Sequence, residues 1–335
     1  MKICELSAWG FENLHYRNVD TPRPGPDQVL LKFGAASVNY RDYQIVAGEF
    51  APTQPLPIIQ GSDGAGEIVA TGDHVEGLSV GDRVSPLFFP EWISGEALGI
   101  ERSVSSGLET PGVLREYGLY EQHQVCRVAP HLTDVEASCY PCAGLTAWNS
   151  LITLSGIEAG DTVLVQGTGG VAIMALQMAK AMGAQVIVTS CSNDRLQRAL
   201  ELGADHGINY SDTPNWGQAA RELTDGRGVD AVIEIGGEGT LPQSITALRR
   251  GGHINVIGYL AGIGLGLSVF DLIERNANLH GLSVGNREQF EKMMDFVGEH
   301  GIRPVVDRTY SFDKAGQAMQ DIASGGSFGK LVVTI

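Results

Sequence analysis

One short stretch limits the fold of this chain more than any other. The apolar run Thr162 to Val165 leads into the turn Gln166-Gly167-Thr168-Gly169-Gly170-Val171-Ala172 and then into an almost wholly apolar segment of helical length. A strand, a glycine-rich turn and a buried helix in this order are typical of the first unit of a doubly wound sheet. Gly167 permits the tight turn, Gly169 allows a close approach of backbone and ligand, and Ala172 lets the helix pack on the strand.

Further apolar runs follow at the spacing expected of alternating strands and helices. They are Gln185 to Thr189, Gly207 to Tyr210, Ala231 to Ile235, His253 to Ile257 and Leu279 to Val284. Short unbroken apolar runs are expected where helices cover both faces of a parallel sheet. The sequence therefore predicts an α/β fold with a Rossmann domain over residues 131–286.

The glycine turn predicts a binding site for the pyrophosphate of a dinucleotide. The N-terminus of the following helix offers N–H groups and the positive end of the helix dipole to an anion. Thr168, Gly170 and Val171 complete the turn, so we include them with Gly167 and Gly169 among the cofactor-binding residues. Such a turn also occurs for steric reasons alone, but the further strands at the right spacing favour a nicotinamide dinucleotide.

The end of the second strand bears on which dinucleotide binds. An NAD site usually places Asp or Glu there, where the carboxylate accepts hydrogen bonds from the adenosine ribose. This chain has Ser190, with Ser192 and Arg195 close behind. Hydroxyl and guanidinium groups bind a 2′-phosphate that a carboxylate would repel, so the sequence favours NADP(H). In the alternatives, Ser192 merely caps a helix, Arg195 is solvated, or Asp194 turns inward to the ribose.

Size and composition restrict the remaining classes of protein. A chain of 335 residues exceeds the usual size of a single core, so two domains are expected. The net charge of -16 argues against a nucleic-acid or anionic-membrane partner. We expect neither a signal peptide nor a membrane span, because the first residues lack an apolar run and no stretch reaches ~20 apolar residues. The scattered cysteines are typical of reduced thiols in a cytoplasmic protein. The expected partner is a small-molecule substrate.

Residues 1–130 have a different sequence pattern, with short runs of β-forming residues broken by glycine and proline. Pro86 to Leu114 contains Phe88, Phe89 and Trp92 and is longer than most connections, which predicts a lid or a surface loop. Together with Tyr259, which follows the fifth strand, these aromatic residues are candidates for lining an apolar pocket. The simpler interpretation is that they pack in the core, as aromatic residues usually do.

Several motifs are spread over almost the whole chain. They are Val-Asn-Tyr-Arg-Asp at 38–42, Gly-Ser-Asp-Gly-Ala-Gly at 61–66, Gly-Asp-Arg-Val at 81–84, Ala-Gly-Leu-Thr-Ala-Trp at 143–148, the glycine turn, Leu-Gly-Ala-Asp at 202–205 and Ile-Asn-Tyr at 208–210. With them the chain resembles the medium-chain dehydrogenase/reductase superfamily, and in particular its zinc-independent branch that includes quinone oxidoreductases. The resemblance implies a GroES-like catalytic domain of residues 1–130 and 287–335. It also implies a homodimer joined through edge strands of the cofactor domains.

The same resemblance implies further cofactor contacts. In the NADPH-using members a basic residue, a tyrosine at the end of the third strand and a basic residue near the C-terminus hold the 2′-phosphate. Arg195, Tyr210 and Lys330 stand at these positions, although Lys330 could also simply open the final strand. Thr146 matches a family position that faces the nicotinamide, and we expect Tyr259 to contact the cofactor.

For catalysis the resemblance points to the start of the chain. Asn39 and Asp42 match family positions beside the nicotinamide, and Tyr43 is a nearby hydroxyl. We expect Asn39 to orient the substrate. As alternatives, Asp42 forms a structural hydrogen bond to Arg41 or to backbone, and the tyrosine packs in the core. The proton donor is not identified.

The residues that would hold a catalytic zinc are mostly replaced. Zinc-using relatives carry cysteine at the position of Asn39, histidine at Ser62 and cysteine at Cys142, and this chain keeps the last alone. Because an amide and a hydroxyl replace thiolate and imidazole poorly, we expect no zinc.

Without this Lewis acid, reduction of a quinone or an enone by NADPH is the chemistry the sequence favours. Two alternatives stay open. One is a zinc-free alcohol or carbonyl dehydrogenase, and the other is a non-catalytic NADPH-binding structural or sensor protein.

Overall fold

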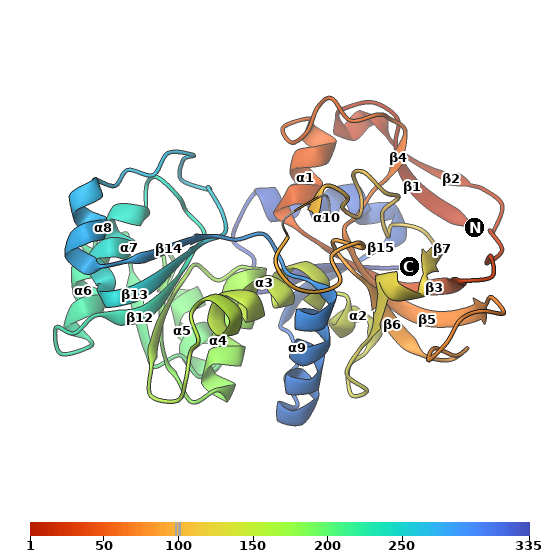
Figure 1. Cartoon of the computed structure of the whole chain (residues 1–335). Coiled ribbons are helices and arrows are strands. Elements are labelled where there is room, and N and C mark those ends of the chain that lie inside the picture. Colours follow the sequence, from red (N-terminus) through yellow and green to blue (C-terminus); the bar gives the residue numbers. More distant parts are fainter. Residues whose placement is uncertain (98, 100–101) are drawn as a thin grey trace. The chain divides into compact units, whose positions relative to one another are not determined.

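The chain divides into two compact units, Met1–Leu145 with Val284–Ile335, and Thr146–Ser283 (Figure 1). The computed structural model describes residues 1–97, 99 and 102–335. The sequence placed the first boundary earlier, after residue 130. Helix α2 (Asp134–Ala137) belongs to the first unit because it packs on strands β3 (Gln28–Val38) and β5 (Asp63–Thr71).

The second unit, which is described throughout, contains a six-stranded parallel sheet in the order β11-β10-β9-β12-β13-β14. The strands are β9 (Thr162–Gln166), β10 (Gln185–Ser190), β11 (His206–Asn209), β12 (Val229–Glu234), β13 (Leu248–Val256) and β14 (Asn278–Gly281). The chain winds outward from β9 in both directions, as a Rossmann sheet does. The predicted α/β fold is confirmed.

Burial explains why the apolar runs of this sheet are unbroken. Every residue of β9 and of β12 is buried, because helices cover both faces. The helices are α4 (Gly170–Ala181), α5 (Asn193–Glu201), α6 (Trp216–Glu222), α7 (Leu241–Ala247) and α8 (Val269–Arg275). Trp216 and Leu241 join Leu164 and Val232 in the core of this unit.

The first unit is built from both ends of the chain. Strand β16 (Lys330–Thr334) pairs antiparallel with β3, with Leu331 opposite Val38. The larger sheet has the order β15-β16-β3-β5-β6-β8, with β7 also paired to β3, and a smaller sheet has the order β2-β1-β4. The remaining strands are β1 (Lys2–Leu6), β2 (Leu14–Asn18), β4 (Ile58–Ile59), β6 (Arg83–Pro86), β7 (Tyr117–Glu121), β8 (Val125–Arg127) and β15 (Val306–Ser311).

Three longer helices complete this unit among its described residues: α1 (Tyr40–Ala47), α9 (Arg287–His300) and α10 (Ala315–Ala323). Helix α9 begins with a capping box between Asn286 and Gln289.

The stretch from Pro86 to Leu114 is not a loop of exposed aromatic residues. Phe88, Phe89 and Trp92 are all buried, and the carbonyl of Trp92 accepts a 2.9 Å hydrogen bond from the backbone N–H of Arg287. The simpler interpretation, that these aromatic residues pack in the core, therefore holds. Part of the stretch, residues 98, 100 and 101, lies outside the described residues.

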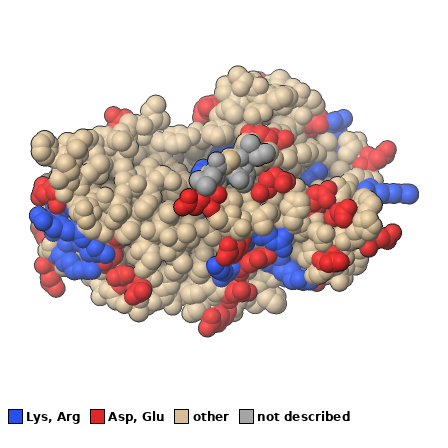
Figure 2. All heavy atoms as spheres, viewed as in Figure 1, with Lys and Arg blue, Asp and Glu red and all other residues tan. Residues whose placement is uncertain are grey.

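The surface carries the acidic excess in dispersed form. On the face shown in Figure 2, acidic and basic side chains are interspersed with large uncharged areas. Within the described part of the chain, a search for helices of sufficient length and apolarity to cross a bilayer finds none.

A core substitution tests the packing of the first unit. Phe290 on α9 is completely buried, so Phe290→Ala should lower the free energy of unfolding of this unit by about 3–5 kcal/mol. The matched change Val80→Ala, at a side chain that is 61% exposed, should alter it by less than about 0.5 kcal/mol. Urea unfolding followed by circular dichroism measures both, and equal effects would contradict the packing.

Candidate active site

The candidate catalytic residues meet where strand β3 gives way to helix α1. Asn39 is the N-cap of α1, and its backbone N–H donates a 2.8 Å hydrogen bond to Oδ2 of Asp42. This capping box fixes the first turn of the helix. Asp42 is 1% exposed, and this bond is the hydrogen bond to backbone that was its alternative to a catalytic role.

A chain of side-chain hydrogen bonds continues from Asp42. Ser62 Oγ donates to Asp42 Oδ1 at 2.7 Å, and Asn39 Nδ2 donates to Ser62 Oγ at 3.0 Å. Lys330 Nζ, from the opposite end of the sequence, donates to Asn39 Oδ1 at 2.6 Å. The amide of Asn39 is therefore held at both its oxygen and its nitrogen.

The structure corrects the prediction for Lys330. We expected this side chain to hold the 2′-phosphate of the cofactor, but it is 2% exposed and also donates to the carbonyl of Val38 at 2.9 Å. A buried ammonium group needs such partners to offset the loss of water. Because Lys330 donates to Asn39 and to the carbonyl of Val38, it belongs to this cluster of candidate catalytic residues.

Asp63 is the residue of this cluster that sequence reasoning missed. It is fully buried, its Oδ2 accepts from the backbone N–H of Cys142 at 3.2 Å, and Lys330 Nζ lies 4.0 Å away. Its Oδ1 has no hydrogen-bond partner among the described residues. Burial raises the pKa of Asp63 to about 6, although Lys330 and Asn39 act to lower it. Its place in the Gly-Ser-Asp motif, directly after Ser62, was the sequence signal that could have identified Asp63.

The thiol of Cys142 lies in the same environment. Burial raises its pKa, and the charge of Asp63 raises it further, while Lys330 acts in the opposite direction. A thiol of this kind stays protonated at neutral pH.

Tyr43, predicted as a catalytic hydroxyl, packs instead among aromatic rings. Its ring centroid lies 5.7 Å from that of Phe11 and 5.8 Å from that of Tyr40, and it packs against the core of the first unit. Arg41 does not pair with Asp42 through a hydrogen bond. Its guanidinium donates to Ser105 and Ser106 and lies 4.9 Å from the ring centroid of Phe88.

The glycine turn of the second unit has the geometry that an anion site needs. Gly167 has a φ of 74°, in the region that favours glycine, and its N–H donates to the carbonyl of Thr189 at 2.8 Å. Gly169 is the N-cap of α4, and no side chain caps this helix. A Cβ atom added at Gly169 would meet no atom within 4 Å. The N-terminus is therefore open to a phosphate.

The serines after strand β10 make local hydrogen bonds. Ser190 is buried, and its hydroxyl accepts from the backbone N–H of Ser192 at 3.3 Å. Ser192 in turn caps α5, because its hydroxyl accepts from the backbone N–H of Arg195 at 3.3 Å. The cap interpretation of Ser192 is thus correct, and Asp194 lies in the first turn of α5 as a helix acid. Each hydroxyl still carries a hydrogen that it can donate.

Arg195 and Tyr210 both contact Cys191, a residue that was not predicted as part of the cofactor site. Arg195 Nη2 donates to Cys191 Sγ at 3.2 Å, and a hydrogen bond with Cys191 raises the pKa of Tyr210. Cys191 and Tyr210 are both exposed. The guanidinium of Arg195, the phenol of Tyr210 and the thiol of Cys191 thus lie together beyond the end of β10, where a ligand can reach them.

Thr146 and Tyr259 remain predictions as cofactor contacts. Thr146 is buried, and its carbonyl accepts from Ser150 Oγ at 2.8 Å. Tyr259 is 46% exposed in the loop after β13.

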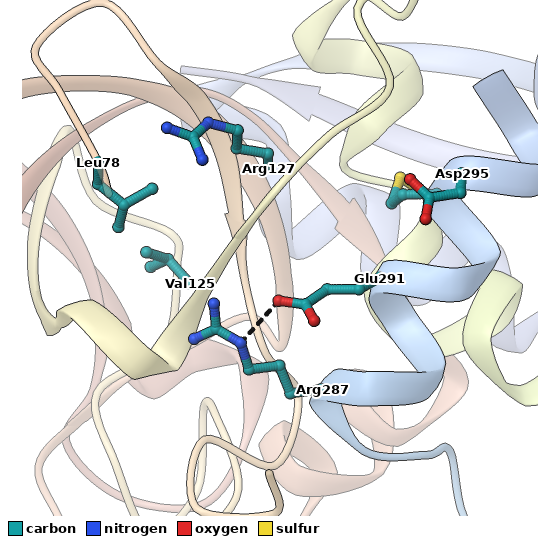
Figure 3. A pocket seen from close by; sticks show the side chains of 7 residues that line it. Leu78, Val125, Arg127, Arg287, Glu291 and Asp295 are labelled. Atoms are coloured by element: carbon teal, nitrogen blue, oxygen red, sulfur yellow. Dashed lines mark hydrogen bonds and ion pairs between the residues drawn. The ribbon is translucent and has the colours of Figure 1, made fainter. Parts of the chain in front are cut away.

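A surface pocket of about 140 Å³ lies elsewhere in the first unit (Figure 3). Arg287 and Glu291, both from α9, line it and form an ion pair at 2.8 Å, and Arg127 lines it as well. The pocket contains none of the predicted site residues.

Comparison with known proteins agrees with this architecture. Residues 25–130 match the family described as "Alcohol dehydrogenase GroES-like domain", and residues 170–299 match "Zinc-binding dehydrogenase". A "zinc-type alcohol dehydrogenase-like protein" of Schizosaccharomyces pombe is 39% identical over 97% of this chain and 96% of its own length. The chain belongs to the medium-chain dehydrogenase/reductase superfamily.

Solved structures of this superfamily are similar along the whole chain. A protein titled "NAD-dependent alcohol dehydrogenase" is 30% identical, with a TM-score of 0.91 and complete coverage of both chains. A mycobacterial protein solved in complex with NADPH is 26% identical, with a TM-score of 0.82 and complete coverage of both chains. This dehydrogenase/reductase is therefore an oxidoreductase with a nicotinamide-dinucleotide fold.

The residues of this cluster fit a zinc ion poorly. Two of the positions that the resemblance gives to zinc ligands carry an amide and a hydroxyl, and Lys330, whose Nζ lies 4.0 Å from the Asp63 carboxylate, would repel a divalent cation. Across residues 1–97, 99 and 102–335, no group of three or more His, Cys, Asp or Glu side chains is arranged to hold a metal.

The raised pKa of Asp63 predicts a pH dependence of stability. The folded protein holds a proton on Asp63 up to about pH 6, whereas an aspartate of the unfolded chain titrates near pH 4. The contribution of this group is fully present below about pH 4 and is lost as the pH rises to about 6. The free energy of unfolding of the wild type, minus that of Asp63→Asn, should therefore fall over this range in urea unfolding.

Asp313→Asn is a control for which the pH dependence of the free energy of unfolding should have the opposite sign. The hydrogen bond from Ser311 lowers the pKa of Asp313, so the corresponding difference should rise as the pH rises toward about 4 and stay nearly level above it. A difference for Asp63 that stays constant from pH 4 to 6 would contradict the raised pKa.

Proposed function

We propose that this protein is an NADPH-dependent reductase of quinones or enones that works without zinc. The observation that carries the proposal is the cluster of Asn39, Ser62 and Lys330. In it an oriented amide and a hydroxyl stand where the resemblance places metal ligands, and a fixed ammonium lies beside them. Such a site lacks a Lewis acid for stabilising an alkoxide. It suits substrates whose double bond is already electron-poor.

The protein groups have separable roles in this proposal. Bound NADPH supplies a hydride to an electrophilic carbon of the substrate. Asn39 orients a substrate oxygen, and the hydrogen bond from Lys330 to its amide oxygen makes the amide N–H groups stronger donors. Asp63, with its pKa of about 6 and an oxygen without a partner, can hold the proton that balances the hydride.

The preference for NADP(H) rests on the group after strand β10. Ser190, Arg195 and Tyr210 offer hydroxyls and a guanidinium, and the strand ends without a carboxylate. These donors suit a 2′-phosphate. The similarity to a protein named NAD-dependent makes NAD the competing cofactor.

Alcohol or carbonyl dehydrogenation without zinc is the second candidate function. It is favoured by the names of the relatives, which are mostly alcohol dehydrogenases. In that case the hydrogen-bonded chain from Ser62 to Asp42 would serve as the proton relay.

We also propose that the protein is a cytoplasmic homodimer. Strand β14 is an edge of its sheet, and the segment before it exposes large apolar side chains. They are Leu260, Ile263, Leu265, Val269, Phe270 and Ile273. Such an apolar surface beside a free strand edge suits a second copy of the chain. The free cysteines agree with a reducing compartment.

Substrate choice tests the proposed reaction. We expect oxidation of NADPH, followed by its absorbance, with a quinone and with an enone, and little with a simple ketone. Treatment with a strong zinc chelator should leave the rate unchanged, because no step needs a metal. Turnover of simple ketones alone would overturn the proposal, as would loss of activity on chelation together with stoichiometric zinc in the untreated protein.

A double substitution tests the cofactor preference. Ser190→Asp with Arg195→Ala replaces a donor by a carboxylate and removes the guanidinium, so kcat/KM for NADPH should fall by roughly tenfold or more and NADH should become preferred. Arg198→Ala removes the same charge from the same helix and should leave the preference unchanged. If the wild type uses NADH as well as NADPH, the assignment fails.

A further inference from the structure

A buried carboxylate stands at the carboxyl end of strand β12. Glu234 is completely buried, and its Oε1 accepts from the backbone N–H groups of Gly236 at 2.8 Å and Gly237 at 3.0 Å and from Thr240 Oγ1 at 2.5 Å. Its Oε2 accepts from Gln166 Nε2 at 2.6 Å and from the Ser244 hydroxyl. Donors from three segments of the second unit thus converge on one side chain.

One of these donors belongs to the phosphate turn. Gln166 is the last residue of β9 and directly precedes Gly167. Its Oε1 also accepts from the backbone N–H of Ile235 at 3.2 Å, so the amide is held at both ends. A Cβ atom at Gly167 would lie 3.2 Å from the side chain of Ile235. The start of the turn is therefore packed and hydrogen-bonded against the end of β12.

The position of Glu234 in the sheet gives this contact its meaning. Strands β9 and β12 are neighbours, and β10 lies on the other side of β9, so the direction of winding changes between β9 and β12. In open α/β sheets ligands bind at this switch point, beyond the carboxyl ends of the strands. Glu234 lies beneath it and joins its two sides.

The segment after β12 is in turn hydrogen-bonded to the loop that follows β13. The carbonyl of Gly236 accepts from the backbone N–H of Ala261 at 2.7 Å, and the backbone N–H of Glu238 donates to the carbonyl of Gly262 at 3.1 Å. The loop that holds Tyr259 is thereby fixed to the residues that Glu234 orders.

We propose that Glu234 is a positioning residue for the dinucleotide, whose carboxylate locks the phosphate turn and the facing loop in the conformation that binds the pyrophosphate. The inference rests on the proposed cofactor binding and adds a residue that makes no cofactor contact itself. A carboxylate is the group required, because it is an acceptor at every position, whereas a glutamine would turn a donor toward these N–H and O–H groups.

The same strand supplies a matched control at its other end. Asp230 is 2% exposed, accepts from the backbone N–H of Thr162 at 2.8 Å and pairs with Arg227 and Arg249. Like Glu234 it is a buried carboxylate that joins β12 to β9. It lies at the amino ends of these strands, away from the switch point.

The experiment compares Glu234→Gln with Asp230→Asn in the full chain. Both changes should lower the melting temperature. At a temperature well below both transitions, Glu234→Gln should raise the Kd for NADPH by roughly tenfold or more in calorimetry, as when a buried hydrogen-bonding group loses its partner. Asp230→Asn should leave the Kd unchanged. Because the pyrophosphate is common to both coenzymes, Glu234→Gln should weaken NADH equally and leave the NADPH to NADH ratio unaltered.

The outcomes are distinct from those of the proposed function. If the wild type binds neither coenzyme, the proposed function fails. If the wild type binds and the two variants weaken binding equally, or not at all, the role of Glu234 is refuted. Should Glu234→Gln fail to fold, Thr240→Val removes one donor and keeps the carboxylate. It should weaken both coenzymes by a smaller, equal factor, and an unchanged Kd would refute the proposal.

Discussion

The burial of one ammonium group governs the arrangement of the catalytic unit. Lys330 opens the last strand, and its charge is acceptable there because Val38 and Asn39 offer acceptors at 2.9 and 2.6 Å. These contacts join the C-terminal strand to the start of α1. The orientation of the Asn39 amide follows, and through Ser62 so does the environment of Asp42.

The same ammonium determines which chemistry the cluster suits. It places a positive charge beside Asp63 and Cys142, in a site whose amide and hydroxyl are poor ligands for zinc. The charge is fixed in position and polarises the groups around it, as an oriented dipole would. A shared fold does not by itself carry a metal site, because the function depends on the residues present at the site.

In the second unit, a buried negative charge orders its surroundings as the buried positive charge of Lys330 does in the first. Glu234 is buried at the carboxyl edge of the sheet, and the donors around it come from the turn, the strand ends and α7. A buried carboxylate is stable when its lone pairs are filled, so its neighbours are held in place as well. In each unit, a buried charged side chain therefore orders the backbone next to the candidate site.

The sequence by itself determined the succession of strands in the cofactor unit, the glycine turn and the membership of both chain ends in one domain. These features depend on local periodicity, on the conformational freedom of Gly167 and on motifs, all of which are readable along the chain. Asn39 and Asp42 were also found from their motif. The tertiary structure alone decided the role of Lys330, the inclusion of Asp63 and Cys191, and the packing of Tyr43 and of the aromatic residues after Pro86. The reason is physical: whether a side chain is buried, and which groups neutralise it, depends on residues as distant in sequence as Asn39 and Lys330, and no local pattern contains that information.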